Sequence, residues 1–174
     1  MEPDSRYQGG MTSRGSSGWR YAIAGGLIAG ALDIMYACVF WGLEAGVPAR
    51  RIFQTVAAGL LGREAAIAGG YRTAALGLAL HFFIALTMAA IYFLVARRWA
   101  VLWRRPWLMG GLYGLWLYVA MNYIVVPLSA AGGGATDAVW VTLSVVVHVF
   151  LIGVPCALAA RYGILHERPD QRLS

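Results

Sequence analysis

The sequence predicts an all-α fold, an integral membrane antiparallel four-helix bundle, and three observations lead to it. Of the 174 residues, 60% are hydrophobic and only 13% are charged, a composition that excludes an ordinary water-soluble domain. Four apolar runs are each long enough to cross a bilayer, since about 20 helical residues span its ~30 Å hydrocarbon core. Basic residues gather in the segments that flank these runs.

The four expected spans cover residues 21–43, 73–96, 107–127 and 138–160. The second is the clearest, because it contains no Asp, Glu, Lys or Arg and is apolar on every face, whereas a soluble helix of this length keeps a polar face. For the first run, a secretory signal cleaved near Ala31 is the alternative interpretation. The apolar run continues past Ala31 to Trp41, which favours a membrane span.

The segments outside the spans differ in character. Residues 1–20 are polar and rich in Gly and Ser, so we expect a mobile N-terminal tail, and residues 161–174 form a short charged C-terminal tail. In the connection between spans two and three, tryptophans alternate with arginines. This pattern binds nucleic acid in some soluble proteins, but between two spans it is typical of an anchor at the membrane interface. We therefore expect no nucleic-acid partner.

Residues 44–72 carry too many charges to cross a bilayer, but they predict a short helix. Pro48 suits a first helical turn and Gly62 suits a helix end. Between them, apolar and polar residues fall on opposite helical faces. The apolar residues are Ile52, Phe53, Val56 and Leu60, and the polar residues are Arg50, Arg51, Gln54 and Thr55. We expect an amphipathic helix on the membrane surface, with an ordinary structured loop as the alternative.

The distribution of arginine predicts the orientation of the chain. All fourteen basic residues are arginines, of which ten lie in the two tails and the second connection and four lie in the first connection. The positive-inside rule then places both termini in the cytoplasm. The lipid bilayer, with its anionic headgroups, is the partner that this charge suits.

Each span carries one polar side chain that is costly in hydrocarbon. These residues are Asp33, His81, Asn122 and His148. Counted from the outer helix ends at about 1.5 Å per residue, all four lie ~9–15 Å below the outer interface. Each also lies on a helical stripe of small residues, the face that packs against other helices in lipid. We therefore expect the four side chains to converge on one pocket in the outer half of the membrane.

Within such a pocket, Asp33 and His148 are the candidate proton-handling groups, and His81 and Asn122 are the candidate orienting partners. A carboxyl group and an imidazole that share a pocket can exchange protons near neutral pH. Each residue also has a purely structural explanation. Asn122 can hydrogen-bond across helices, and either histidine can make a packing hydrogen bond.

Motifs for the common enzyme classes are absent from the sequence, which contains no zinc-protease, serine-hydrolase, P-loop or Cys-x-x-Cys pattern. Cys38 and Cys156 lie inside apolar runs, where a thiol acts as a small hydrophobic group, so we expect neither a disulfide nor a metal site. His81 and His148 could together hold a b-type haem, because they lie on separate spans. This pair is the one indication of a cofactor.

Four blocks of the sequence carry a family resemblance. They are GLIAGALDIMYACVFWGL, GLLGREAAIAGGYRTAALGLALHFFIALTMAAIYFLVARR, YGLWLYVAMNYIVVPLSA and HVFLIGVPCALAARY. Together they resemble a group of small four-span bacterial inner-membrane proteins of unknown function, over most of the chain beyond the N-terminal tail. The resemblance implies a bacterial inner membrane and the four-span plan, and it brings no activity, ligand or catalytic residue.

Two functions are open from the sequence. The first is a site that binds or passes a small polar molecule or a proton. The second is an accessory or assembly subunit, in which small-residue faces at residues 26–30 and 110–114 dock onto a membrane-protein partner or a second copy, and the polar residues join the helices. The chain shows no inverted repeat and is short for two matching halves, which disfavours a free-standing alternating-access transporter.

Overall fold

A computed structural model of the chain describes residues 17–131 and 137–168. The described residues form helices and no strand. Four of the helices are long and apolar enough to cross a membrane, which confirms the expected all-α class and the number of long apolar helices. They are Gly18–Ala45, Gly70–Ala96, Pro106–Leu128 and Ala138–Glu167.

The first and second long helices are continuous, and the third and fourth each contain a π-helical segment. The first two are α1 (Ser17–Ala45) and α4 (Gly70–Ala96). The third consists of α6 (Pro106–Ala120), η1 (Met121–Val125) and α7 (Val126–Leu128). The fourth consists of α8 (Ala138–Val147), η2 (His148–Gly153) and α9 (Val154–Glu167). Three short helices connect them, namely α2 (Ala49–Leu61), α3 (Arg63–Ala68) and α5 (Ala100–Arg104).

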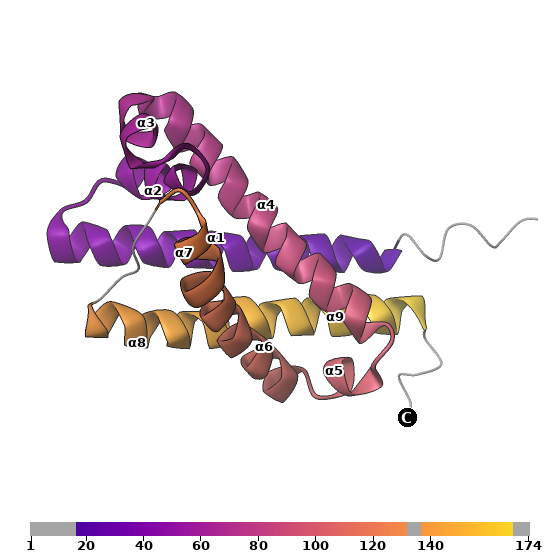
Figure 1. The fold of residues 1–174 in the computed structure, drawn as a ribbon. Coiled ribbons are helices and arrows are strands. Elements are labelled where there is room, and N and C mark those ends of the chain that lie inside the picture. The colour runs from indigo at the N-terminus through magenta and orange to yellow at the C-terminus, as the bar shows by residue number, and fades with distance from the viewer. Residues whose placement is uncertain (1–16, 132–136, 169–174) are drawn as a thin grey trace, which may run out of the picture.

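The long helices cross one another, with α1 packed against both α4 and α9, and α6 packed against η2 and α9. Figure 1 shows α1 beside the rod formed by α8, η2 and α9, while α4 and α6 run diagonally across them. The first turn of α1 meets the end of α9, where Gly18 lies against Glu167 and Gly163. The short helices α2 and α3 lie at one end of the assembly, and α5 lies at the other, together with the start of α1 and the end of α9.

A close backbone contact joins α6 to η2. A Cβ atom on Gly114 would meet the carbonyl oxygen of His148, and one on Gly153 would meet the backbone of Gly110 and Gly114. Only glycine allows two helix backbones to approach this closely, and such contacts are characteristic of helix pairs in membranes. This packing fixes the position of His148 relative to α6.

The helix α2 has the expected bounds but a different buried face. Pro48 precedes its first residue, and Gly62, with φ 79°, ends it. Gln54, expected among the polar residues that face the headgroups, is only 2% exposed, whereas Leu60, expected on the apolar face, is 63% exposed. Gln54 is buried because its Nε2 donates to the carbonyl oxygens of Gly70, at 2.9 Å, and Ile67, at 3.3 Å. The polar side chain thus attaches α2 to the turn between α3 and α4.

The tails also differ from the expected bounds. The helix α1 begins at Ser17, and α9 continues to Glu167 rather than ending near residue 160. Arg161, expected in the tail, lies in α9 and donates through Nη1 to the carbonyl oxygens of Trp103 and Arg104, both at 3.3 Å. Residues 1–16 and 169–174, for which we expected tails, and residues 132–136 of the Gly-rich turn lie outside the described residues.

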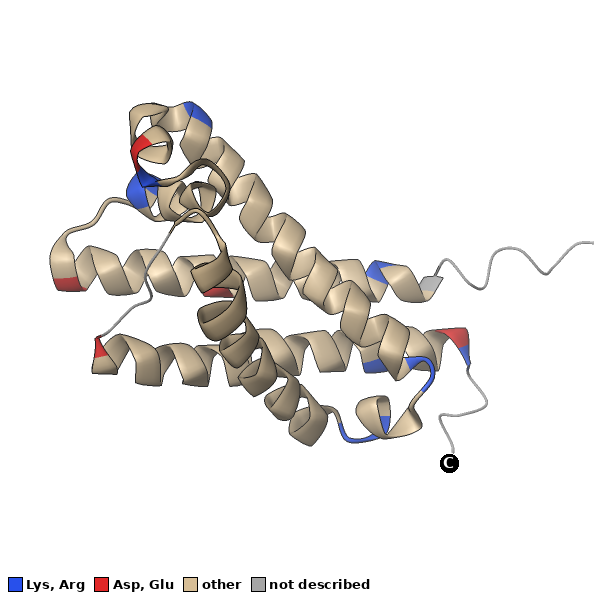
Figure 2. Cartoon of the chain, viewed as in Figure 1, with Lys and Arg blue, Asp and Glu red and all other residues tan. Residues whose placement is uncertain are grey.

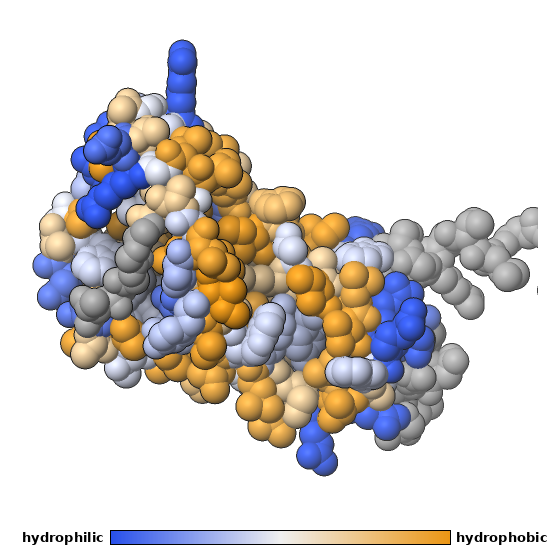
Figure 3. Space-filling model, viewed as in Figure 1, coloured by the Kyte–Doolittle hydropathy of each residue, from blue (hydrophilic) through white to orange (hydrophobic). Residues whose placement is uncertain are grey.

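Charged residues gather at the two ends of the helices. In Figure 2 the blue and red segments lie mostly at the connections, and the middle of the molecule is largely tan. In Figure 3 the face in view has an orange band over the middle of α4 and α6, with blue regions at either end. Many of the large side chains in this middle region are exposed and apolar, among them Phe83, Leu112, Ile124 and Phe150. This distribution supports a multi-pass membrane protein.

Candidate functional site

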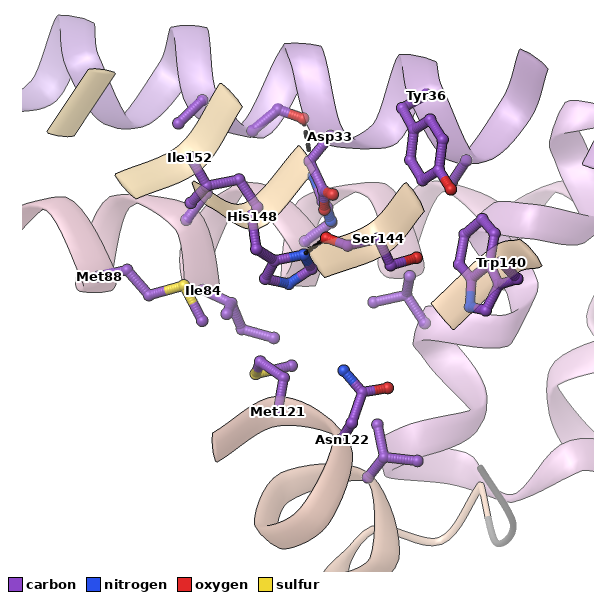
Figure 4. Close-up of a pocket in the computed structure, with 17 residues that line it drawn as sticks. Asp33, Tyr36, Ile84, Met88, Met121, Asn122, Trp140, Ser144, His148 and Ile152 are labelled. Atoms are coloured by element: carbon purple, nitrogen blue, oxygen red, sulfur yellow. Dashed lines mark hydrogen bonds between the residues drawn. The ribbon is translucent and has the colours of Figure 1, made fainter. Parts of the chain in front are cut away.

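A cavity of about 230 Å³ lies between the long helices (Figure 4). All four polar residues singled out in the spans line it, although they come from different helices. They are Asp33 on α1, His81 on α4, Asn122 in η1 and His148 in η2. The walls are otherwise mainly apolar, with Ile84, Met88, Met121 and Ile152 among the lining residues.

His81 is held in place by α1. Its Nε2 lies 2.8 Å from the backbone carbonyl oxygen of Gly30. A carbonyl oxygen only accepts, so this ring nitrogen carries a proton and donates. The other nitrogen, Nδ1, is left to accept a hydrogen bond or to take a second proton.

His148 is held by its own helix in a similar way. Its Nδ1 lies 2.8 Å from the carbonyl oxygen of Ser144, and therefore donates to it. Its ring also makes an edge-to-face contact with Tyr118 on α6, with ring centroids 5.4 Å apart. Figure 4 shows the ring reaching into the cavity toward the side that carries Met121 and Asn122. The nitrogen Nε2 is thus the group that His148 presents to the cavity.

Asn122 makes its hydrogen bond within its own helix. Its Nδ2 donates to the carbonyl oxygen of Tyr118 at 3.0 Å. Asn122 lines the cavity (Figure 4), but among the described residues it makes no hydrogen bond to another helix, in contrast to the link between helices that the sequence suggested, and its amide oxygen has no partner there. Asn122 therefore adds a hydrogen-bond acceptor to the cavity wall.

The two π-helical segments have a common cause. Pro127 and Pro155 lack an N–H group, and their rings would clash with the carbonyl one turn earlier. In each case the residue before the proline bonds five residues back instead of four, Val126 to Met121 and Val154 to Val149. The widened turns contain Asn122 and His148. Such segments inside α-helices occur frequently at functional sites.

Asp33 faces the same cavity without a direct partner. Its carboxyl group lines the cavity together with His81 and His148. Within residues 17–131 and 137–168, however, it makes no hydrogen bond or ion pair. Placing an ionised carboxylate in an apolar region without a partner is costly. The empty space beside Asp33 is therefore the place where compensating polar groups would lie.

Two further hydroxyl groups line the cavity without a hydrogen-bond partner among the described residues. They are Ser144 Oγ and the phenol oxygen of Tyr36. Ser144 is only 4% exposed. The two hydroxyls are near neighbours across the interface of α1 and α8, yet their geometry does not form a hydrogen bond. Buried polar groups without partners are rare in proteins, and ordered water or a ligand commonly satisfies them.

Tyr36, Ser144 and Trp140 also line the cavity, but none of them was among the site residues predicted from the sequence. Helical spacing is the signal that could have identified the first two, since Tyr36 follows Asp33 by three residues and Ser144 precedes His148 by four. Trp140 stacks on Tyr36, with ring centroids 5.2 Å apart and planes 12° apart. This aromatic pair forms one end wall of the cavity (Figure 4).

A second cavity of about 790 Å³ adjoins the first. Both are lined by Val56, Ile84, Met121 and Val126. The second cavity lies beside α2 and the start of α3, and its lining includes Arg51 and Arg63. It therefore extends the polar site toward the end of the helices where α2 and α3 lie.

Comparisons with family models, curated proteins and solved structures give no match to this chain. Among the described residues, no group of three or more His, Cys, Asp or Glu side chains is arranged to hold a metal ion.

Proposed function

We propose that this chain is a multi-pass protein of a bacterial inner membrane, an antiparallel four-helix bundle whose cavity binds a small polar molecule. The distribution of charge supports an orientation with both termini in the cytoplasm. Among the described residues, the end with the start of α1 and the end of α9 carries seven arginines and one glutamate. The opposite end carries four arginines and three carboxylates. The larger, adjoining cavity then opens toward the outer face.

One observation carries the proposal: a cavity between apolar helices is lined by polar groups whose hydrogen-bonding capacity is unused. His81 and His148 each present one ring nitrogen, and Asp33 presents a carboxylate without a direct partner. The hydroxyl of Ser144 is buried and unpaired among the described residues. A volume of about 230 Å³ holds several water molecules or one small organic molecule. The unused groups supply both donors and acceptors for such an occupant.

The packing at the cytoplasmic end favours binding over permeation. Ala29 and Ile152 line the cavity and belong to a buried cluster with Cys156. A second buried cluster follows toward the chain ends, in which Phe93 and Ala160 have no exposed surface. Interiors packed in this way leave no continuous path for water or solutes. A molecule that enters from the outer side would therefore leave by the same side.

The size of the cavity argues against a haem. Pockets that enclose drug-sized ligands have volumes of roughly 300–1,000 Å³. The cavity has about 230 Å³. The cavity that holds both histidines is smaller than this range, so the unused nitrogens of His81 and His148 are better suited to hydrogen bonds with a smaller molecule.

The small-residue faces that suggested an accessory subunit pack within the chain itself. Gly26 and Gly30 lie against α4, and Gly110 and Gly114 lie against η2 and α9. These faces are not available to helices of a partner protein. The ligand-binding hypothesis is therefore the better supported of the two.

The free energy of unfolding of the Ser144→Ala variant tests whether the cavity is filled. This test does not require that the ligand be known. If water or a ligand bonds to the hydroxyl, its removal lowers the free energy of unfolding by about 1 kcal/mol. If the cavity is dry, removing an unpaired buried hydroxyl leaves the protein equally or more stable. Thr142→Ala is the matched control on the same helix, because the Thr142 hydroxyl is exposed and donates only to the carbonyl oxygen of Ala138.

A ligand screen completes the test. Thermal unfolding in nanodiscs is measured with polyols, amino acids, amines and short carboxylic acids at millimolar concentration. A molecule that binds only the folded state raises the unfolding temperature, and Asp33→Asn is expected to reduce this rise. The proposal is overturned if no compound raises the unfolding temperature and Ser144→Ala is at least as stable as the wild-type protein.

A further inference from the structure

A groove separate from the candidate site lies at the end of α4, on the side of the molecule where the described chain ends meet. It extends from the last turn of α4 across the turn that follows to the end of α9. Its lining combines two exposed aliphatic residues, one exposed tryptophan and three arginines. They are Leu94, Val95, Trp99, Arg97, Arg98 and Arg168.

Two of the three arginines are uncompensated among the described residues. Arg97 forms an ion pair with Glu167, at 3.6 Å, and its guanidinium lies over the ring of Phe93. Arg98 and Arg168 are both exposed, and no carboxylate within residues 17–131 and 137–168 pairs with either. Two guanidinium groups at one groove therefore favour an anion.

The apolar part of the groove continues along α4. Three exposed apolar residues form one stripe on the helix surface, because residues three and four apart are neighbours on a helix. They are Ile91, Leu94 and Val95. Trp99 lies where this stripe meets the arginines, and tryptophan is enriched at the boundary between hydrocarbon and headgroups. The groove thus joins an anion-binding end to an apolar surface in the direction of the membrane interior.

We propose that this groove binds one anionic phospholipid of the surrounding bilayer. The phosphodiester group lies between Arg98 and Arg168, and an acyl chain follows the stripe from Val95 to Ile91. A free phosphate ion would use the arginines but not the stripe. A zwitterionic lipid would use the stripe, but its positive headgroup would oppose the arginines.

Native mass spectrometry tests this site. The full chain is reconstituted in nanodiscs that contain equal amounts of phosphatidylglycerol and phosphatidylcholine, and the lipids that stay bound after its release are identified. We expect the wild-type protein to retain phosphatidylglycerol preferentially. The double variant Arg98→Gln, Arg168→Gln should retain about 25-fold less, because each of the two arginines near an anionic surface contributes a factor of about five. The double variant Arg98→Lys, Arg168→Lys keeps the charge and should keep most of the retained lipid.

The matched control is the double variant Arg104→Gln, Arg105→Gln, which removes the same charge at the same end but outside the groove. It should retain phosphatidylglycerol like the wild-type protein. The proposal is overturned if the control loses as much lipid as the groove variant, if both lipids are retained equally, or if inorganic phosphate displaces phosphatidylglycerol at millimolar concentration. The unfolding temperature of every variant in phosphatidylcholine nanodiscs verifies that the fold is retained.

Discussion

The imidazole of His81 on α4 donates to the backbone carbonyl oxygen of Gly30 on α1, with Nε2 and the oxygen 2.8 Å apart. The contact depends on glycine, because a Cβ atom at position 30 would come within 3.0 to 3.2 Å of Ala85 and Phe82 on α4. A close approach of the two helices and a hydrogen bond between them therefore occur at the same point. This bond uses one ring nitrogen of His81, and the second nitrogen makes no hydrogen bond among the described residues.

Replacing His81 by leucine removes this hydrogen bond while keeping a side chain of considerable volume. Interhelical hydrogen bonds in membrane proteins contribute about 0.6 kcal/mol on average and up to about 1.7 kcal/mol. We expect His81→Leu to lower the free energy of unfolding in mixed micelles by about 1 kcal/mol. His166→Leu, at an exposed position at the end of α9, is the control and should change it by less than about 0.5 kcal/mol. Equal stabilities of the two variants would contradict the role of the bond to Gly30.

The contact between α6 and η2 predicts different effects at two glycines on one helix. A Cβ on Gly114 would meet backbone atoms of His148 and Val149, whereas a Cβ on Gly111 would meet only a methyl group of Val149 at an ordinary 3.6 Å. We expect Gly114→Ala to destabilise the fold by about 1–3 kcal/mol, because the helices must separate. Gly111→Ala should be neutral or stabilising by up to about 1 kcal/mol, since alanine favours the helix. Thermal unfolding of both variants checks this, and a harmless Gly114→Ala would show that the helices do not meet here.

The buried amide of Gln54 predicts that α2 is fixed by hydrogen bonds rather than by apolar contact alone. Gln54→Leu keeps the size of the side chain but leaves the carbonyl oxygens of Gly70 and Ile67 without this donor. We expect the free energy of unfolding to fall by about 1–3 kcal/mol and proteolysis between α1 and α4 to become faster. The neighbouring Thr55→Ala, at an exposed hydroxyl that donates to Ile52 in its own helix, should cause neither effect. Equal rates of proteolysis for the two variants would contradict this account.

The sequence was sufficient to predict the long helices, because their apolar length depends on composition alone. Gly70–Ala96 and Ala138–Glu167 begin within three residues of the expected spans at residues 73 and 138. The end of the fourth helix was not predictable, because an arginine after an apolar run is typical of a tail, and only the structure shows that Arg161 bonds to Trp103 and Arg104. The direction of Gln54 was not predictable either, since the carbonyl groups that bury it lie 13 and 16 residues further along the chain.

For the site, helical spacing and depth were enough to select the four polar residues that line the cavity. Their individual hydrogen bonds were not predictable. The side chains of Asn122 and His148 bond to carbonyl groups in their own helices, and they lie in π-helical turns whose extra residue changes the direction of a side chain. The sequence placed prolines near these turns, but a proline can also kink a helix or end it. Only the three-dimensional structure distinguishes these outcomes.

The central claim is that four polar side chains from separate helices face one water-accessible cavity inside the apolar region. To test this claim, single cysteines are introduced at the four cavity positions of a variant that lacks Cys38 and Cys156. A membrane-impermeant methanethiosulfonate reagent then reports which of these cysteines are accessible from water. The cavity positions are Asp33, His81, Asn122 and His148. Each has a matched control two residues along, on the outer surface of the same helix. These controls are Met35, Phe83, Ile124 and Phe150, which are 56%, 67%, 54% and 57% exposed.

The account predicts that the reagent modifies all four cavity cysteines from the outer side of the membrane and leaves the four control cysteines unmodified. A thiol in contact with lipid stays protonated and unreactive, whereas a thiol in a hydrated cavity ionises. Equal modification of the two sets, or modification of the cavity set from opposite sides of the membrane, would contradict a single cavity shared by the four helices.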